Sequence, residues 1–314
     1  MALKVTFAVP VYNGSRYIRD VLEAVKSQTI QPHEIIVVDD GSTDGTRDMV
    51  SGIEGVRLVE KPHTGLSDTR NRAIREARGE FICFLDSDIV LESNWLEEIF
   101  RNTDFKDVSA ATGYVDTLNK DKSIFCMMDE KTLRAVFTGE PQVFSMGNRR
   151  VNYFNYVFKR EVFDMVGGFD VMFKTNGEDI EFFYRFFSKG MKVKYVPSAV
   201  AHHIYLIDSA YAWFRKRMNY GGSALTDVMY HVGWKRKAWH YGRVFGFFAC
   251  LPLLFIEPLI PIFLTLSFLL FVLRRGYRMM GSIPLTLVYA ATVCFEQVGR
   301  VRETVKWHLG VYRR

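Results

Sequence analysis

The sequence predicts an α/β protein in which helices cover both faces of a mostly parallel sheet, followed by an apolar α-helical membrane region. Three observations support this fold class. Apolar runs rich in Val and Ile alternate with segments of helical periodicity over residues 5–100. Polar clusters follow most of these runs, where a strand would end. The charge is also divided, since residues 1–201 carry 26 basic and 30 acidic side chains, whereas residues 202–314 carry 15 and 5.

Four strands separated by helices are predicted in the first 105 residues. The strands are expected at residues 5–9, 34–38, 56–60 and 81–85. The helices are expected at residues 15–28, from Ser42 or Thr43 to Val50, and at 67–77. Crossovers of this kind produce parallel strands, whose carboxyl ends meet at one edge of the sheet, where such folds bind their ligands.

Residues 106–210 are predicted to complete the same domain. A weak strand pattern lies near residues 108–115, and another near 192–196 stops at Pro197. Between them, Glu178 and Asp179 open a segment in which phenylalanines recur at helical spacing.

The C-terminal region is apolar enough to meet a membrane. Residues 244–273 contain a single charged side chain, Glu257, and exceed the about 20 residues that a bilayer crossing needs. Three prolines interrupt this run, and Arg243 and Arg274-Arg275 flank both ends, which disfavours one straight crossing. We expect a re-entrant hairpin near Glu257. Two crossings, or a buried helical core of a soluble protein, are the alternatives.

A basic segment rich in Trp and Tyr joins the two regions. We divide the chain into a first domain at 1–210 (halves 1–105 and 106–210), a basic amphipathic linker at 211–243 and an apolar helical region at 244–314. Within the last, the apolar piece at 283–295 is expected to lie in the membrane interface.

The composition excludes several classes of protein. A hydrophobic content of 48% is too high for a disordered chain. The four cysteines are scattered without a Cys-x-x-Cys pair, which disfavours a disulfide framework or a zinc knuckle and is typical of a reducing compartment. No Gly-x-Gly-x-x-Gly follows the first strand, so a nicotinamide dehydrogenase is not expected. Uncharged runs between the basic groups of the tail favour lipid over nucleic acid as its partner.

The sharpest chemical signal is Asp86-Ser87-Asp88, directly after the apolar run at 81–85. Two carboxylates one residue apart can hold a hard divalent cation, and that cation can bridge a diphosphate. Asp-x-Asp is also common in solvated loops, and its place at a strand end favours the metal site. His202 and His203 are candidates for a further metal ligand or a phosphate contact, although a histidine pair near a strand end is commonly structural.

A second acidic pair, Asp39 and Asp40, follows the second strand. A carboxylate there can accept a hydrogen bond from a nucleobase N–H, with Pro10 and Tyr12 as the neighbouring wall. A turn with a helix cap is the alternative, and both can hold together. Arg70 lies in the third predicted helix, from which its guanidinium could reach a phosphate.

Glu178 and Asp179 form the third acidic pair. Carboxylates at a helix start gain from the helix dipole, which is the structural interpretation. The functional interpretation is a general base that takes a proton from an attacking hydroxyl.

Taken in order, these motifs resemble a known family. The runs at 10–13 (Pro-Val-Tyr-Asn) and 38–44 (Val-Asp-Asp-Gly-Ser-Thr-Asp), Arg70-Asn71 and the Asp-Ser-Asp at 86–88 resemble the nucleotide-sugar half of family 2 glycosyltransferases, which have the Rossmann-like GT-A fold. The segments at 155–160, 166–170 and 177–179 resemble the acceptor half. The resemblance covers residues 5–205, about two-thirds of the chain.

The resemblance implies a role for each matching position. The nucleotide sugar, with UDP-sugar favoured, would be bound by residues from both halves of the motif set. Pro10, Tyr12 and Asp40 would hold the nucleobase with Asp39 beside them, Arg70 would face the diphosphate, and Ser87 would lie near the donor. Mg²⁺ or Mn²⁺ would be held by Asp86 and Asp88, with His202 and His203 as candidate additions. Asp179 would be the catalytic base, with Glu178 adjacent. The family inverts at the anomeric carbon by one in-line displacement.

One departure from the family narrows the expected reaction. Processive members carry Gln-x-x-Arg-Trp after the base, and residues 212–221 lack it. This disfavours a processive polymerase. Because Glu178 and Asp179 supply a base, we expect transfer of one sugar to a hydroxyl of a lipid-linked or membrane-proximal glycan, by an enzyme at the cell membrane with its catalytic domain on the cytoplasmic side. The alternatives are a polyprenyl-phosphate glycosyl synthase, whose anionic acceptor has little need of a base, and a non-catalytic membrane scaffold.

Overall fold

The computed structural model describes residues 3–118, 123–127, 140–146, 155–173, 177–204, 207, 209–216, 270, 273 and 274. The chain forms two compact units, one of Met1–Asn119 with Leu133–Leu206 and one of Lys120–Thr132 with Ile207–Arg314. The first unit contains the sheet and every predicted site residue. Among the described residues, no helix is both long and apolar enough to cross a membrane. The predicted membrane region lies almost entirely outside these residues.

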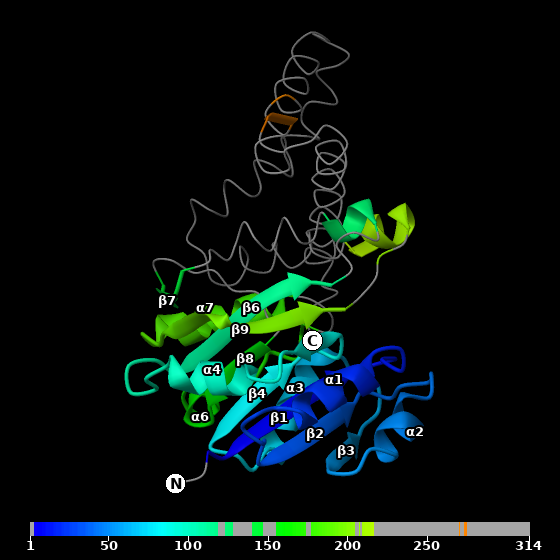
Figure 1. The fold of residues 1–314 in the computed structure, drawn as a ribbon, viewed down its shortest axis with the longest axis horizontal. Coiled ribbons are helices and arrows are strands. Elements are labelled where there is room, and N and C mark those ends of the chain that lie inside the picture. The colour runs from blue at the N-terminus through cyan, green and yellow to red at the C-terminus, as the bar shows by residue number, and fades with distance from the viewer. Residues whose placement is uncertain are drawn as a thin grey trace. The chain divides into compact units, whose positions relative to one another are not determined.

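Nine strands form one mixed sheet in the described part of the first unit (Figure 1). They are β1 (Val5–Val11), β2 (Glu34–Asp39), β3 (Val56–Glu60), β4 (Phe81–Leu85), β5 (Ile89–Leu91), β6 (Ala110–Thr117), β7 (Gln142–Phe144), β8 (Asn155–Lys159) and β9 (Val193–His203). Their order is β3-β2-β1-β4-β8-β6-β9-β5, with β7 paired to β9. The four predicted strands β1 to β4 are parallel, as expected. Because β8 is antiparallel to both β4 and β6, the sheet as a whole is mixed rather than mostly parallel.

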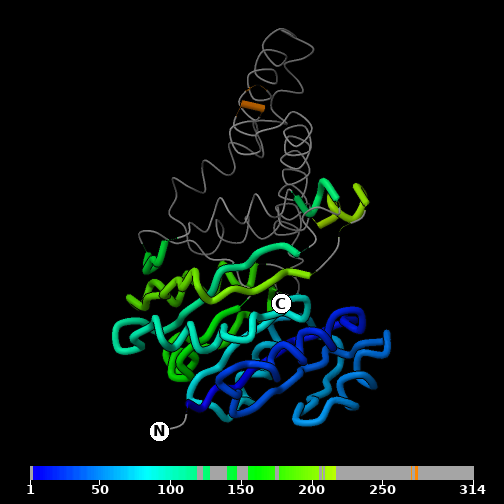
Figure 2. The backbone as a smooth tube through the Cα atoms, viewed as in Figure 1, coloured from blue at the N-terminus to red at the C-terminus, as the bar shows by residue number. Residues whose placement is uncertain are grey.

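Helices cover both faces of the sheet, as predicted (Figure 2). They are α1 (Ile18–Lys26), α2 (Thr46–Ser51), α3 (Leu66–Glu76), α4 (Trp95–Arg101), α6 (Glu161–Val166) and α7 (Glu178–Ser188). Phe7 points to the core beneath α1, α2 and α4, and the next residue of β1, Ala8, points to the core beneath α3, α6 and α7. The second core is largely aromatic. It includes Phe163 and Phe182, and burial of each such ring contributes about 2 kcal/mol.

The prediction that a strand ends at Pro197 is wrong, because β9 continues to His203. The β6–β9 register jumps between Gly113, which pairs with Val196, and Tyr114, which pairs with Val200. Pro197, which has no N–H to donate, therefore lies in an irregularity that needs no ladder bond from it. The chain passes so close that a Cβ on Gly113 would lie 2.1 Å from the Ala199 carbonyl oxygen. This bulge carries His202 and His203 within the strand rather than beyond it.

Two smaller boundaries also differ from the prediction. The second helix begins at Thr46 instead of Ser42 or Thr43, since these two residues contact the loop after β1. The first strand continues through Pro10, which pairs with Val38. The later start of this helix leaves Ser42 and Thr43 at the carboxyl edge of the sheet, against the loop after β1.

Candidate active site

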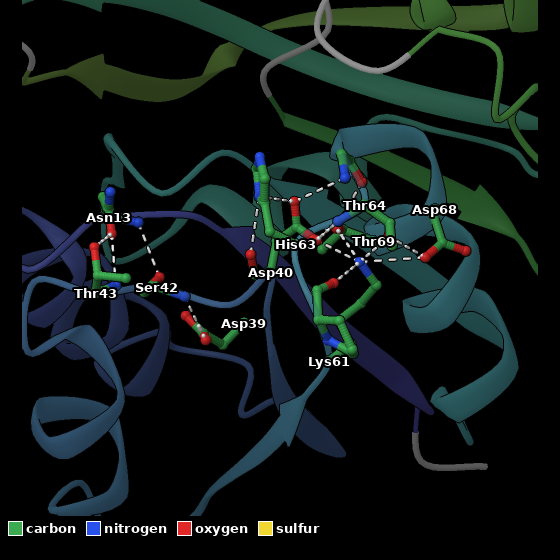
Figure 3. A network of polar contacts seen from close by, with 12 residues as sticks. Asn13, Asp39, Asp40, Ser42, Thr43, Lys61, His63, Thr64, Asp68 and Thr69 are labelled. Carbon is green, nitrogen blue, oxygen red and sulfur yellow. Dashed lines mark hydrogen bonds and ion pairs between the residues drawn. The ribbon is translucent and has the colours of Figure 1, made fainter.

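The loop after β1 is held to the loop after β2 by hydrogen bonds between Asn13 and the residues Ser42 and Thr43, which follow the acidic pair Asp39-Asp40 (Figure 3). Asn13 N–H donates to Ser42 Oγ at 2.9 Å, and Asn13 Oδ1 accepts from Thr43 N–H at 2.8 Å. Gly14 N–H donates to Thr46 Oγ1 at 3.0 Å. Asn13 has a φ of 53°, an uncommon left-handed conformation that these contacts support. The motif therefore shapes the site wall as well as supplying carboxylates.

Asp40 anchors the loop between β3 and α3 (Figure 3). Its buried carboxylate accepts hydrogen bonds from the Thr64 and Gly65 N–H groups, each at 3.0 Å, and from the Lys61 ammonium. His63 Nδ1 lies 2.9 Å from the same carboxylate. Burial alone would raise the pKa of Asp40, but these hydrogen bonds lower it below its usual value. Both carboxylate oxygens are thus engaged by the protein.

This anchored loop places an aromatic pair at the edge of the sheet. The rings of Tyr12 and His63 are stacked, with centroids 4.1 Å apart. Because His63 Nδ1 is also 3.0 Å from the Asp40 carbonyl oxygen, that nitrogen carries a proton and donates it. Both rings remain about half exposed. They form a surface on which a nucleobase can stack.

Asp39 differs from its neighbour in having an unused acceptor. Its Oδ2 accepts from Ser42 N–H at 3.0 Å. Its Oδ1 is buried and has no hydrogen-bond partner among the described residues. A buried carboxylate oxygen without a donor is costly, and a nucleobase N–H is the kind of group that satisfies it. The geometry therefore favours Asp39 over Asp40 as the acceptor of a base N–H.

The third polar cluster lies in the turn from β4 to β5. Asp88 Oδ2 is 3.2 Å from Nε2 of His203, a buried residue of β9. Successive residues of a strand point to opposite faces, and His202 accordingly contacts Glu92 at 3.2 Å instead. The structure thus brings His203, but not His202, to the Asp-Ser-Asp turn. Ser87 lies beside the loop after β1, since a Cβ on Gly14 would be 3.6 Å from its Oγ.

The donor set of this turn suits a hard divalent cation. The Asp86 and Asp88 side chains are each about 30% exposed, so their oxygens can be reached, and His203 adds a nitrogen. Within the described residues, no three acidic, His or Cys side chains form a ready-made metal cage. Such a turn would hold Mg²⁺ or Mn²⁺ by one or two carboxylates together with phosphate oxygens and water, which is how Mg²⁺ is commonly bound.

Arg70 connects this turn to the acidic pair at the start of α7. Its side chain is 2% exposed. One guanidinium nitrogen donates to Asp86 Oδ1 at 3.2 Å, and another donates to Glu178 Oε1 at 2.6 Å. The guanidinium also lies over the Phe169 ring, 5.4 Å from its centroid. Residues distant in sequence are thereby joined at one buried charge.

Asp179, next to Glu178, has the electrostatics of a general base. Burial and the neighbouring Glu178 carboxylate raise the pKa of Asp179 to about 7, against the opposing charge of Arg70. Burial likewise raises the pKa of Asp86 to about 7, with Arg70 opposing the rise and Asp88 adding to it. A carboxylate with a pKa near 7 is matched to proton abstraction at neutral pH.

The predicted site residues therefore fall into two connected groups and one outlier. Pro10, Tyr12, Asp39 and Asp40 line the ends of β1 and β2, while Arg70 joins the Asp-Ser-Asp turn to Glu178 and Asp179. His202 is the outlier. Lys61 and His63 were not predicted from the sequence, because they belong to no recognisable motif and reach the site through contacts with Asp40 and, for His63, with Tyr12.

Residues 6–164, half of the chain, match the family described as Glycosyl transferase family 2. The chain belongs to this family and is a glycosyltransferase. It is similar to EpsH of Bacillus subtilis, a protein named as a glycosyltransferase, with 29% identity over 242 residues that cover 71% of this chain and 67% of EpsH. It is also 28% identical to the chondroitin synthase of Pasteurella multocida over 232 residues, which are 62% of this chain but only 24% of that protein.

A solved structure shares the fold. The mannosyltransferase PcManGT of Pyrobaculum calidifontis, determined with GDP-Man and Mn²⁺, superposes with a TM-score of 0.63 over 96% of this chain and 87% of its own, at 18% identity. The architecture is thus that of GT-A-like glycosyltransferases, and the catalytic chemistry of this family is glycosyl transfer from a nucleotide sugar.

We expect Asp179→Asn to stabilise the fold increasingly as the pH rises. Because the folded-state pKa of Asp179 is about 7, above the usual 3.8, the folded chain binds more protons than the unfolded chain between these values, and stability falls as the pH rises through this window. Asparagine removes this dependence. The melting temperature of the variant, relative to wild type, should therefore increase by a few degrees between about pH 5 and pH 8. Asp20→Asn, also in the first turn of a helix but exposed, is the matched control. A difference that does not change with pH would contradict the raised pKa.

Proposed function

We propose that this protein transfers one sugar from a nucleotide-diphosphate sugar to a hydroxyl group of a glycan, with inversion at the anomeric carbon and with Mg²⁺ or Mn²⁺ at the Asp-Ser-Asp turn. The observation that carries this proposal is the buried Arg70 contact, because it joins Asp86 on the donor side to Glu178, the neighbour of Asp179. The carboxylate that can bind a cation and the carboxylate that can take a proton therefore belong to one charge network.

The reaction proposed here is a single displacement. Asp179 takes the proton of the acceptor hydroxyl, the hydroxyl oxygen forms a bond to the anomeric carbon, and the bond from that carbon to the phosphate oxygen breaks. The nucleoside diphosphate leaves with the electron pair of that bond. A divalent cation bound by Asp86 and Asp88 would supply positive charge to the departing diphosphate. Burial and Glu178 raise the pKa of Asp179, whereas the helix dipole of α7 and the charge of Arg70 lower it. The balance leaves the pKa at about 7, near neutral pH.

For the nucleobase, the unpaired Asp39 Oδ1 supports a base that carries a ring N–H. Uracil, thymine and guanine have such a group, whereas N3 of cytosine accepts rather than donates. UDP is the donor nucleotide that we propose, with stacking on the Tyr12–His63 pair. GDP is the alternative, since a structural neighbour was solved with GDP-Man.

For the acceptor, the raised pKa of Asp179 supports a hydroxyl group. A phosphate acceptor, as in polyprenyl-phosphate glycosyl synthases, is already anionic and gains little from a base. A non-catalytic scaffold has no use for two carboxylates with pKa values near 7 around one buried guanidinium.

The experiment for this function is titration of UDP, GDP, dTDP and CDP into the purified full-length protein, with Mn²⁺ and with EDTA. We expect UDP to bind in the presence of Mn²⁺, and CDP to bind at least about tenfold more weakly because it lacks the ring N–H that Asp39 would accept. Asp88→Ala should abolish the effect of Mn²⁺. The matched control is Asp107→Ala, because Asp107 is an exposed aspartate outside the site.

The outcome of the titration distinguishes the proposals. Binding that Mn²⁺ does not strengthen would contradict the cation site. No nucleotide binding by folded protein would leave the scaffold as the better explanation. Asp179→Asn should retain binding but lose most of the turnover of the nucleotide sugar, and turnover that survives this change would favour a phosphate acceptor.

We further propose that the basic and apolar C-terminal part associates with the membrane, on the cytoplasmic side, and that the acceptor is lipid-linked or membrane-proximal. This proposal rests on the sequence: residues 202–314 carry 15 basic and 5 acidic side chains around long uncharged runs. Juxtamembrane basic residues contribute about 1 kcal/mol each on anionic lipid.

Flotation with lipid vesicles tests the membrane proposal. Replacement of Arg215, Lys216 and Arg217 by Gln should reduce recovery on vesicles that contain about 30% anionic lipid, while recovery on neutral vesicles changes little. The same replacement of three exposed lysines of the first unit, Lys26, Lys189 and Lys192, is the control. Equal recovery of the two variants would contradict a role for the basic segment.

A further inference from the structure

The guanidinium of Arg70 is shared between two carboxylates from different parts of the chain. It donates to Asp86 in the turn after β4 and to Glu178 at the start of α7, and its side chain is 2% exposed. The Glu178 side chain is also buried, at 6% exposure. A buried charge pair of this kind costs much to break, because the partner left behind keeps an uncompensated charge.

The helix that carries Arg70 is fastened to the same region by two further side chains. Asn71 makes two backbone hydrogen bonds to Phe169, each 2.7 Å long, in which it donates to the carbonyl and accepts from the N–H. Ser67 donates to the Phe173 carbonyl. Residues 67, 70 and 71 have the i, i+3, i+4 spacing that places them on one face of α3. This whole face is thus committed to the segment that leads from α6 to α7.

The segment opposite is built to accept these contacts. A Cβ on Gly168 would lie 2.3 Å from Asn71 Oδ1, so only glycine permits this approach. The Asn71 contacts hold Phe169, whose ring lies against the Arg70 guanidinium. The position of Arg70 is therefore determined by its surroundings, which differs from the long, solvated side chain expected of a residue that reaches out to a ligand.

We propose that Arg70 is a positioning residue that holds the donor-side Asp86 and the base-side Glu178 in one arrangement, and that it is not a ligand of the diphosphate. Glu178 has a defined part in this arrangement, since it balances the charge of Arg70 and leaves Asp86 able to attract a cation. The inference rests on the proposed function and adds to it a coupling between the cation site and the helix that carries the base.

The two possible roles of Arg70 predict opposite effects of one substitution. If Arg70 is a positioning residue, Glu178→Gln leaves Arg70 to neutralise Asp86 alone, and the affinity for UDP with Mn²⁺ falls. If Arg70 binds the diphosphate, Glu178→Gln releases Arg70 toward the phosphates, and the affinity stays the same or rises.

The experiment measures the dissociation constant of UDP with Mn²⁺ for wild type, Arg70→Gln, Glu178→Gln and the double variant. We expect each single variant to bind about tenfold more weakly, and the double variant to bind no more weakly than Arg70→Gln, because residues in one charge network are coupled. Arg72→Gln is the matched control, since Arg72 lies on the same helix and its ion pair within the described part of the chain is a partly exposed contact with Glu76. Arg70→Lys replaces Arg70→Gln if the latter does not fold, as judged by its melting transition.

Each outcome decides a separate question. Unchanged or tighter binding by Glu178→Gln, or losses that add in the double variant, would overturn the positioning role while leaving the proposed function intact. Wild-type protein that binds none of UDP, GDP, dTDP and CDP would overturn the proposed function, and with it the role of Arg70.

Discussion

The structure of the site depends on one buried positive charge, the guanidinium of Arg70, among carboxylates that repel one another. Without it, the like charges of Asp86, Glu178 and Asp179 would be costly to hold close together, and the pKa values of Asp86 and Asp179 are already raised to about 7. Its contacts join the turn after β4 to the first turn of α7. The four parallel strands β1 to β4 and the later part of the first unit are thus connected at the site by charge as well as by the pairing of β4 with β8.

A second constraint operates at the ends of β1 and β2, where the residues that follow β2 hold two other loops in place. Ser42, Thr43 and Thr46 hold the loop after β1, and Asp40 holds the loop after β3. Of the two neighbouring aspartates, Asp39 keeps a buried oxygen, Oδ1, without a hydrogen-bond partner among the described residues. The segment at 39–46 therefore holds two loops, and it also contains the carboxylate oxygen that we propose as the acceptor of a nucleobase N–H.

Much of the fold was predictable because burial leaves a strong periodic signal. The apolar runs of β1 to β4 and the helix α3 were located from that signal alone. The course of β9 past Pro197 was not, because it depends on a register jump against β6 that involves the close approach at Gly113. A strand predicted to continue to residue 203 would have placed His202 and His203 on opposite faces of the sheet, because successive residues of a strand alternate. The contacts of Arg70 and the recruitment of His63 arise only in three dimensions, from residues 16 or more positions apart.

The central claim is that Arg70 keeps its carboxylate partners when the donor is bound. A crystal structure of the protein with UDP and Mn²⁺ tests this most directly. The account predicts that the guanidinium remains within hydrogen-bonding distance of Glu178, while Mn²⁺ lies against Asp88 and the diphosphate oxygens. A guanidinium that has left Glu178 and contacts the diphosphate would contradict it.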